Sequence, residues 1–101
     1  MVKHIVFFNF HESSEGNSRL ENAKIVKKEL ENLIDLIPCL KKIEVGINIP
    51  HAPQTDFDLC LYSEFDSFED LDAYQIHPEH KRVGAFIGKV RSGRSAVDYV
   101  V

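Results

Sequence analysis

Hydrophobic and polar residues alternate over residues 2–11 and then take up a helical period. One face of the first stretch carries mainly apolar side chains, namely Val2, His4, Val6, Phe8 and Phe10. The other face is also rich in apolar groups, so the pattern predicts a strand that is covered on both sides. After a polar loop at 12–18, apolar residues recur every three or four positions as far as Leu36, which predicts an amphipathic helix. Ser18 and Glu21 have the spacing of a capping box, and Pro38 ends the helix.

Two further alternating stretches follow this helix, at about Leu40–Ile49 and Phe57–Phe65. Because a loop of about seven residues joins them, they are expected to pair as a hairpin. Ser67 is expected to cap a short helix, with Asp70 at the position that reaches back to the cap.

A second helical piece is expected from Pro78 to about Val90, with Val83, Phe86, Ile87 and Val90 turned inward. Proline is well tolerated in a first helical turn and disfavours helix in the residue before it, so His77 takes the cap position. Ser92-Gly93 is expected to break this helix, and Ala96–Val101 to form the last strand.

The predicted order is β-α-β-β-α-β, the ferredoxin-like arrangement of the α+β class. Its four strands form an antiparallel sheet with helices on one face only. The 101 residues are expected to make a single domain, 1–101. Ile5, Phe7 and Tyr62 would lie on the opposite face and leave it too apolar to stay in water. We therefore expect a symmetric homodimer in which two such sheets pack together as a dimeric α/β barrel.

Composition narrows the class of partner. Hydrophobic residues make up 44% and charged residues 28%, as in ordinary globular domains. The formal charge of −4 argues against nucleic-acid and acidic-membrane partners, which draw on an excess of Lys and Arg. The apolar run at residues 2–8 is too short to span a membrane, and no cleavage site follows it. Cys39 and Cys60 lie in no CxxC pattern and are interpreted as reduced, buried thiols of a cytoplasmic protein.

The densest cluster of groups that can act near neutral pH lies within residues 71–86. His80 stands one turn into the helix that begins at Pro78, where the positive helix end lowers the pKa of an imidazole. A neutral imidazole is the form that acts as a general base. Tyr74 is a candidate donor to a developing oxyanion, and His4 lies on a strand face that can point to the same place.

Each of these residues also has a purely structural interpretation. His77 is favoured as a helix cap, and His4 is favoured as a core histidine. For Tyr74 and His80 the structural alternative is that each is a buried polar side chain that forms hydrogen bonds and takes no part in chemistry. His77, Glu79 and His80 lack the ligand spacing of structural zinc sites, so no metal is expected. Nucleophile elbows and phosphate-binding glycine loops are missing, and no cofactor is expected.

Several segments are similar to the stress-responsive A/B barrel (Dabb) family. They are Met1–Phe8, Asp58–Leu71, Ala73-Tyr-Gln-Ile-His-Pro-Glu-His80, Ala85–Ile87 and Val97-Asp-Tyr99. The resemblance implies a homodimeric α/β barrel. Plant polyketide cyclases of that family close a linear polyketide by aldol chemistry without a cofactor. The resemblance places their tyrosine and histidine at Tyr74 and His80, and a further histidine at His4. Asn9 and Val100 depart from the family pattern, which often has a lysine and an acidic residue there.

Two functional hypotheses follow. The favoured one is a stress-responsive protein that binds a small apolar or aromatic molecule between sheet and helices. The alternative is a cofactor-independent cyclase or isomerase with His80 as general base, Tyr74 as acid and His4 nearby. In both, the pocket is expected to be lined by Val6, Phe8, Leu61, Tyr74, Val83 and Phe86.

Overall fold

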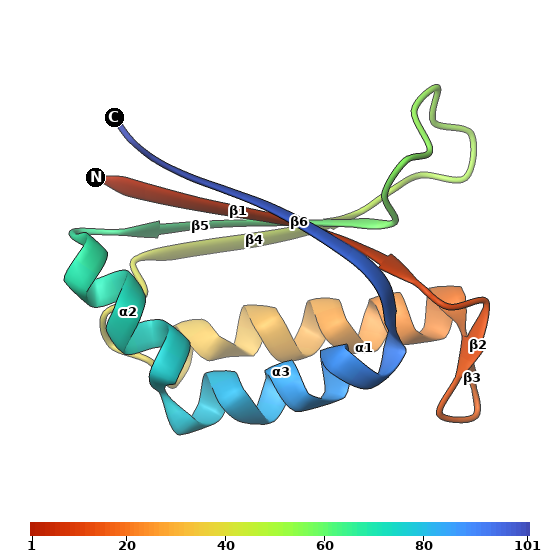
Figure 1. Ribbon diagram of the computed structural model, residues 1–101, viewed down its shortest axis with the longest axis horizontal. Coiled ribbons are helices and arrows are strands. Elements are labelled where there is room, and N and C mark those ends of the chain that lie inside the picture. The colour runs from red at the N-terminus through yellow and green to blue at the C-terminus, as the bar shows by residue number, and fades with distance from the viewer.

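The computed structural model describes residues 1–101, and it has one layer of helices packed on one face of a four-stranded sheet (Figure 1). The main elements are β1 (Val2–Phe10), α1 (Arg19–Asn32), β4 (Lys42–Ile47), β5 (Leu59–Phe65), α2 (Phe68–Ile76), α3 (Pro78–Val90) and β6 (Arg91–Val100). The strand order is β4-β5-β1-β6, and every neighbouring pair is antiparallel. The predicted ferredoxin-like α+β fold is therefore confirmed, as is the hairpin of β4 and β5.

The central strand β1 separates the core from the outer face of the sheet. Its side chains alternate between buried and half-buried along its whole length. The buried set, which includes Val6 and Phe8, faces the helices and joins a core built from all the main elements except β6. Ile5 and Phe7 lie on the outer face, away from the helices. The alternation predicted from the sequence thus divides the side chains of β1 between the hydrophobic core and the outer face of the sheet.

The first helix has the predicted capping box, since Ser18 accepts a hydrogen bond from the Glu21 amide and the Glu21 carboxylate accepts one from the Ser18 amide. A short 3-10 turn, η1 (Leu33–Asp35), extends it towards Pro38. Not every apolar position of the predicted stripe faces the core, because Leu20 is 53% exposed. Asn22 is buried instead, and its amide donates to the Ser14 carbonyl.

The predicted polar loop at 12–18 is a small hairpin, formed by β2 (Ser13–Ser14) and β3 (Asn17–Ser18). Glu15 and Gly16 both have positive φ, at 54° and 78°. Two such residues make the tight turn that suits the twist of a two-residue hairpin. Sequence periodicity misses this element because two residues per strand are too few to show alternation.

The prediction for the last strand is wrong at its beginning. β6 begins at Arg91, directly after α3, whereas Ser92-Gly93 was expected to separate the two elements. Arg91 takes extended backbone angles, φ −78° and ψ 142°, and its pairing with Phe10 starts the ladder with β1. The pairing of β6 with the whole length of β1 outweighs the tendency of Gly93 to interrupt a strand. The register shifts between Asn9 and Phe10, so Ser92 is the extra residue of an irregularity.

None of the helices combines the length and the apolar character that a membrane-spanning helix requires. The two chain ends lie close together at the same end of the sheet, where the Met1 amino group donates to the Val101 carbonyl (Figure 1).

Candidate functional site

A cavity of about 170 Å³ lies on the helix-facing side of the sheet, and we call it the inner cavity. Its apolar wall consists of Val6, Phe8, Leu30, Leu61 and Ile87, and its polar wall of His4, Gln75, His80, Arg91 and Arg94, with Gly84 between them. The contributing elements are β1, β5, β6 and the three helices. The β6 side is open, because nearly every residue of that strand is exposed.

The inner cavity gathers some of the residues that were predicted to line a pocket and leaves others outside. His4, His80, Val6, Phe8 and Leu61 line it. The other predicted lining residues, Tyr74, Val83 and Phe86, do not. Tyr74 and Val83 are buried in the core, and Phe86 is only half-buried at its edge. Helix periodicity identifies an inward face, but it does not say which inward residues meet a void.

His80 is half-buried on the first turn of α3, and its ring centroid lies 4.5 Å from that of Tyr74. Burial is the main cause that lowers the pKa of His80, and the charges of His4, Arg94 and His77 lower it further. A hydrogen bond with the Gln75 backbone acts in the opposite direction. The direction agrees with the expectation from the helix end, while burial is a cause that the sequence could not supply. The neutral imidazole is therefore favoured at neutral pH.

His4 is buried in the middle of β1 and is only 3% exposed. Its Nδ1 is hydrogen-bonded to the carboxylate of Asp98, the residue directly opposite it on β6. Such a contact fixes the ring and holds the proton of a neutral imidazole at Nδ1, which leaves Nε2 as an acceptor. Asp98 was noted in the sequence only as part of the Val97-Asp98-Tyr99 segment, and its contact with His4 was not predicted. Strand register, which pairs His4 with Asp98, was the missing information.

Tyr74 is fully buried, with its ring packed between those of His80 and Phe65 at 4.5 and 4.9 Å. Its hydroxyl has no hydrogen-bond partner. Burial, and after it the charge of Cys39, raise the pKa of this hydroxyl, so the group stays protonated. The Tyr74 ring therefore packs against the His80 ring, but the Tyr74 hydroxyl does not line the inner cavity.

His77 acts as the N-cap of α3, as predicted, since its Nδ1 accepts a hydrogen bond from the Glu79 amide at 3.1 Å. The Glu79 carboxylate is turned to Arg82 on the surface of the helix. No group of three or more His, Cys, Asp or Glu side chains comes together in a way that could hold a metal ion.

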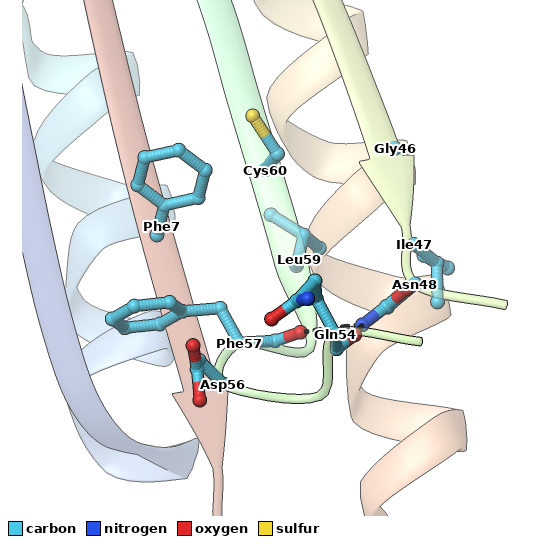
Figure 2. A pocket seen from close by; sticks show the side chains of 9 residues that line it. All are labelled: Phe7, Gly46, Ile47, Asn48, Gln54, Asp56, Phe57, Leu59 and Cys60. Carbon is cyan, nitrogen blue, oxygen red and sulfur yellow. Dashed lines mark hydrogen bonds between the residues drawn. The ribbon is translucent and has the colours of Figure 1, made fainter. Parts of the chain in front are cut away.

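A second cavity, which we call the outer cavity, lies on the opposite face of the sheet and measures about 440 Å³ (Figure 2). Its wall is formed by Phe7, Gly46, Ile47, Asn48, Gln54, Asp56, Phe57, Leu59 and Cys60. Phe7 and Phe57 lie side by side, with ring centroids 5.4 Å apart. The loop between β4 and β5 forms one side and is tied down by hydrogen bonds from the Asn48 amide to the Gln54 and Phe57 carbonyls. Burial raises the pKa of the Cys60 thiol, which makes it a poor nucleophile.

The family model of the Stress responsive A/B Barrel Domain (Dabb) matches residues 2–101. The Stress-response A/B barrel domain-containing protein DABB1 of Arabidopsis thaliana is 28% identical over 102 residues, which cover 99% of this chain and 47% of that protein. The chain therefore spans about half the length of this relative.

Solved structures agree with the fold. A dimeric protein of unknown function with a ferredoxin-like fold from Bacteroides fragilis is 33% identical, with a TM-score of 0.78 and coverage of 99% of this chain and 95% of that one. A hydroxynitrile lyase from Passiflora edulis has a TM-score of 0.81 at 18% identity, with coverage of 99% and 92%. The likeness to the lyase extends to the fold alone.

Proposed function

The chain belongs to the stress-responsive A/B barrel domain family, and from that premise we propose that it binds a small apolar or aromatic molecule in the inner cavity. The observation that carries the proposal is a hollow with an apolar wall on which the imidazoles of His4 and His80 converge. Ligand sites in proteins combine mainly apolar walls with a few placed polar groups. The volume of about 170 Å³ limits the size of the ligand. A dry cavity of about 150 Å³ is large enough for benzene, so the expected ligand has about one ring.

Ligand-observed NMR with benzamide as a neutral one-ring probe tests this proposal. We expect saturable binding with a Kd in the millimolar range, as for other molecules of about nine heavy atoms. Gly84 lines the inner cavity, and a Cβ placed on it would meet nothing within 4 Å. The variant Gly84→Leu should therefore fill the cavity and abolish binding.

The matched control is Gly88→Leu, because Gly88 lies one turn further along α3, also has open space around a Cβ, and does not line the cavity. This variant should bind benzamide as the wild type does. Equal binding by all three proteins would contradict the proposal.

The chain is also proposed to form a homodimer through the outer face of the sheet. Val97 and Tyr99 on this face are 49% and 40% exposed, and Ile5 and Phe7 are only half-buried. The related structure from Bacteroides fragilis is that of a dimeric protein. Light scattering at micromolar concentration should give twice the mass of one chain, and a compact monomer would contradict the proposal.

Two further proposals concern the context of the domain. Residues 1–101 are proposed to act as one domain, because helices and sheet share one hydrophobic core. A cytoplasmic location is proposed on the basis of the free thiols of Cys39 and Cys60. Digestion with protease at low concentration, which should leave the 101-residue unit intact, tests the first.

The second candidate function is cofactor-independent proton transfer, as in a cyclase or isomerase like the plant polyketide cyclases of the family. Two features favour it: the position of His80 at the cavity wall, where burial lowers its pKa, and the orientation of His4 by Asp98. His80 would take a proton from a carbon next to a carbonyl group, while the electron pair moves to the carbonyl oxygen. The enolate oxygen then needs a hydrogen-bond donor. The protonated hydroxyl of Tyr74 would supply it after a turn of that ring towards the cavity, and return of the proton to the carbon closes the cycle.

Exchange of the α-protons of acetophenone in D2O tests this chemistry without knowledge of the substrate. The wild-type protein should accelerate the exchange, and His80→Gln should reduce the rate about 100-fold or more. Tyr74→Phe should reduce it about 100-fold if the hydroxyl is the donor, which is the lower end of the range for loss of one oxyanion contact. An exchange rate that is the same in wild type and His80→Gln would rule out His80 as the base.

A further inference from the structure

Two arginines at the beginning of β6 face the inner cavity. Arg91 lies opposite Phe10 and Arg94 lies opposite Phe8, and both phenylalanines are buried on the helix-facing side. Residues three apart on a regular strand point to opposite faces of a sheet. The extra residue at Ser92 changes this spacing, so both arginines lie on the same face. The irregularity in the ladder therefore builds a pair of positive charges at the open side of the cavity.

Neither guanidinium group is engaged elsewhere in the protein. Neither Arg91 nor Arg94 forms a salt bridge or a side-chain hydrogen bond, in contrast to Arg82, which pairs with both Glu29 and Glu79. No acidic residue lines the inner cavity. The nearest carboxylate on the same face of β6, that of Asp98, is already bonded to His4. A chain of net charge −4 thus concentrates positive potential at one cavity.

We propose that Arg91 and Arg94 select a ligand with a carboxylate, so that the inner cavity takes a small organic acid whose apolar body packs against Val6, Phe8 and Leu61. The inference rests on the proposed binding function and adds the chemical class of the ligand to it. A guanidinium group binds a carboxylate through two parallel hydrogen bonds, and such charge-assisted bonds are about twice as strong as neutral ones. The mouth of the cavity at β6 is where a charged head group can keep part of its hydration while the apolar part enters.

The position of His80 supplies an independent readout. Arg94 is close enough for its charge to lower the pKa of His80. A bound carboxylate would neutralise part of that positive field and would also favour the imidazolium form directly. Binding of an anion should therefore raise the pKa of His80, and binding of a neutral molecule of the same shape should not.

Benzoate and benzamide are the probes, since they share one ring and differ in charge. The wild-type protein should bind benzoate about tenfold more tightly than benzamide at low salt, the size expected for a hydrogen bond to a charged group. Arg91→Gln and Arg94→Gln should each weaken benzoate about tenfold and change benzamide by less than about twofold. Arg82→Gln is the control for loss of one positive charge elsewhere, and it should change neither affinity. An NMR titration of wild type should show that benzoate, and not benzamide, raises the pKa of His80.

The outcomes separate the two levels of the proposal. Equal binding of both probes in wild type would overturn the selection of a carboxylate and leave the proposed binding function standing. Binding of neither probe would overturn both. Inorganic phosphate provides a further arm, because a guanidinium pair also accepts phosphate. If phosphate displaces benzoate at equal concentration, the cavity responds to charge alone and the organic-acid class is wrong. Since the wild-type titration of His80 needs no substitution, a variant that fails to fold does not remove the test.

Discussion

The two faces of the sheet carry two cavities that differ in size and in chemistry. The outer cavity, at about 440 Å³, is more than twice as large as the inner cavity at about 170 Å³. The outer cavity has one carboxylate, from Asp56, and one protonated thiol, from Cys60, and no histidine or basic side chain. The inner cavity has two histidines and two arginines. Cavity volume therefore favours the outer face as the functional site, whereas the ionisable side chains favour the inner face. The ionisable side chains are the better guide to chemistry.

The difference begins with adjacent residues of one strand. On β1, His4 and Phe8 face the helices, while Ile5 and Phe7 face outward. The outer face carries apolar side chains such as Ile5, Phe7 and Val97 beside a polar cluster of Lys3, Tyr62 and Glu64. In the proposed dimer a second copy of the chain would cover this face, and the outer cavity would become part of the interface. The inner face meets the first turn of α3, where the break at Pro78 presents His80 to the sheet. The alternating pattern of β1 thus underlies both the proposed dimer surface and the proposed ligand site.

The largest expected effect compares Phe8→Ala with Phe7→Ala, two neighbours of the same type on opposite faces. Phe8 is buried, so its truncation should cost about 3–5 kcal/mol of unfolding free energy. Phe7 is only half-buried, so its truncation should cost about 1 kcal/mol at protein concentrations where the monomer dominates, and it should weaken the dimer. Chemical denaturation at several protein concentrations measures both effects. Equal losses in the dilute protein would contradict the assignment of the faces.

A second comparison blocks each cavity in turn. Gly46 lines the outer cavity, and a Cβ there would meet nothing within 4 Å, as for Gly84 in the inner cavity. Gly46→Leu should leave benzamide affinity unchanged and weaken the dimer about tenfold or more, since a new side chain would project into the interface. Gly84→Leu should do the reverse. NMR binding and light scattering of the two variants give four results, and loss of ligand binding in Gly46→Leu would place the site on the outer face.

Tyr74→Phe should change the unfolding free energy less than Phe8→Ala, and it should not destabilise the protein. Because the hydroxyl is buried without a partner, its removal should leave the unfolding free energy unchanged or raise it by about 1 kcal/mol. Thermal and chemical unfolding provide the measurement. A loss of about 2 kcal/mol or more would show that the hydroxyl makes a stabilising hydrogen bond in solution.

The smallest expected effect is the contribution of His80 to the pH dependence of stability. Its pKa is lowered in the folded protein, so between that value and the unfolded value near 6.5 the unfolded chain binds more protons. This contribution to stability is complete above pH 6.5 and is lost as the pH falls towards the folded pKa. His80→Asn should flatten the curve in this window, whereas His51→Asn, in the exposed loop between β4 and β5, should not. Identical curves for wild type and His80→Asn would contradict the burial of His80.

Local signals in the sequence were sufficient for most of the fold. Alternation identified β1 and its two faces. Ser18 and Ser67 were predicted as caps from their spacing, and His77 from its position directly before Pro78. The choice of Tyr74 and His80 as a pair came from the family resemblance, and their rings do lie side by side in the structure. These features depend on neighbours within about one or two helical turns, which is the range that periodicity covers.

Strand register accounts for what the sequence did not reveal. Asp98 meets His4 only because β6 pairs with β1 in one particular register. Arg91 and Arg94 share a face only because Ser92 is an extra residue in that pairing, and the sequence predicted that Ser92 and Gly93 would lie outside the strand. The hidden hydroxyl of Tyr74 depends on side-chain packing from three elements. Contacts between distant segments set these features, and a single sequence carries no local sign of them.

Mapping of backbone amide shifts during a benzamide titration reports on both faces of the sheet in one experiment and so locates the ligand site. We expect saturable shifts at Gln75, Gly84 and Ile87, which line the inner cavity, and almost none at Gly46, Phe57 and Cys60, which line the outer cavity. Saturable shifts confined to the second set would contradict binding in the inner cavity and move the site to the outer face of the sheet.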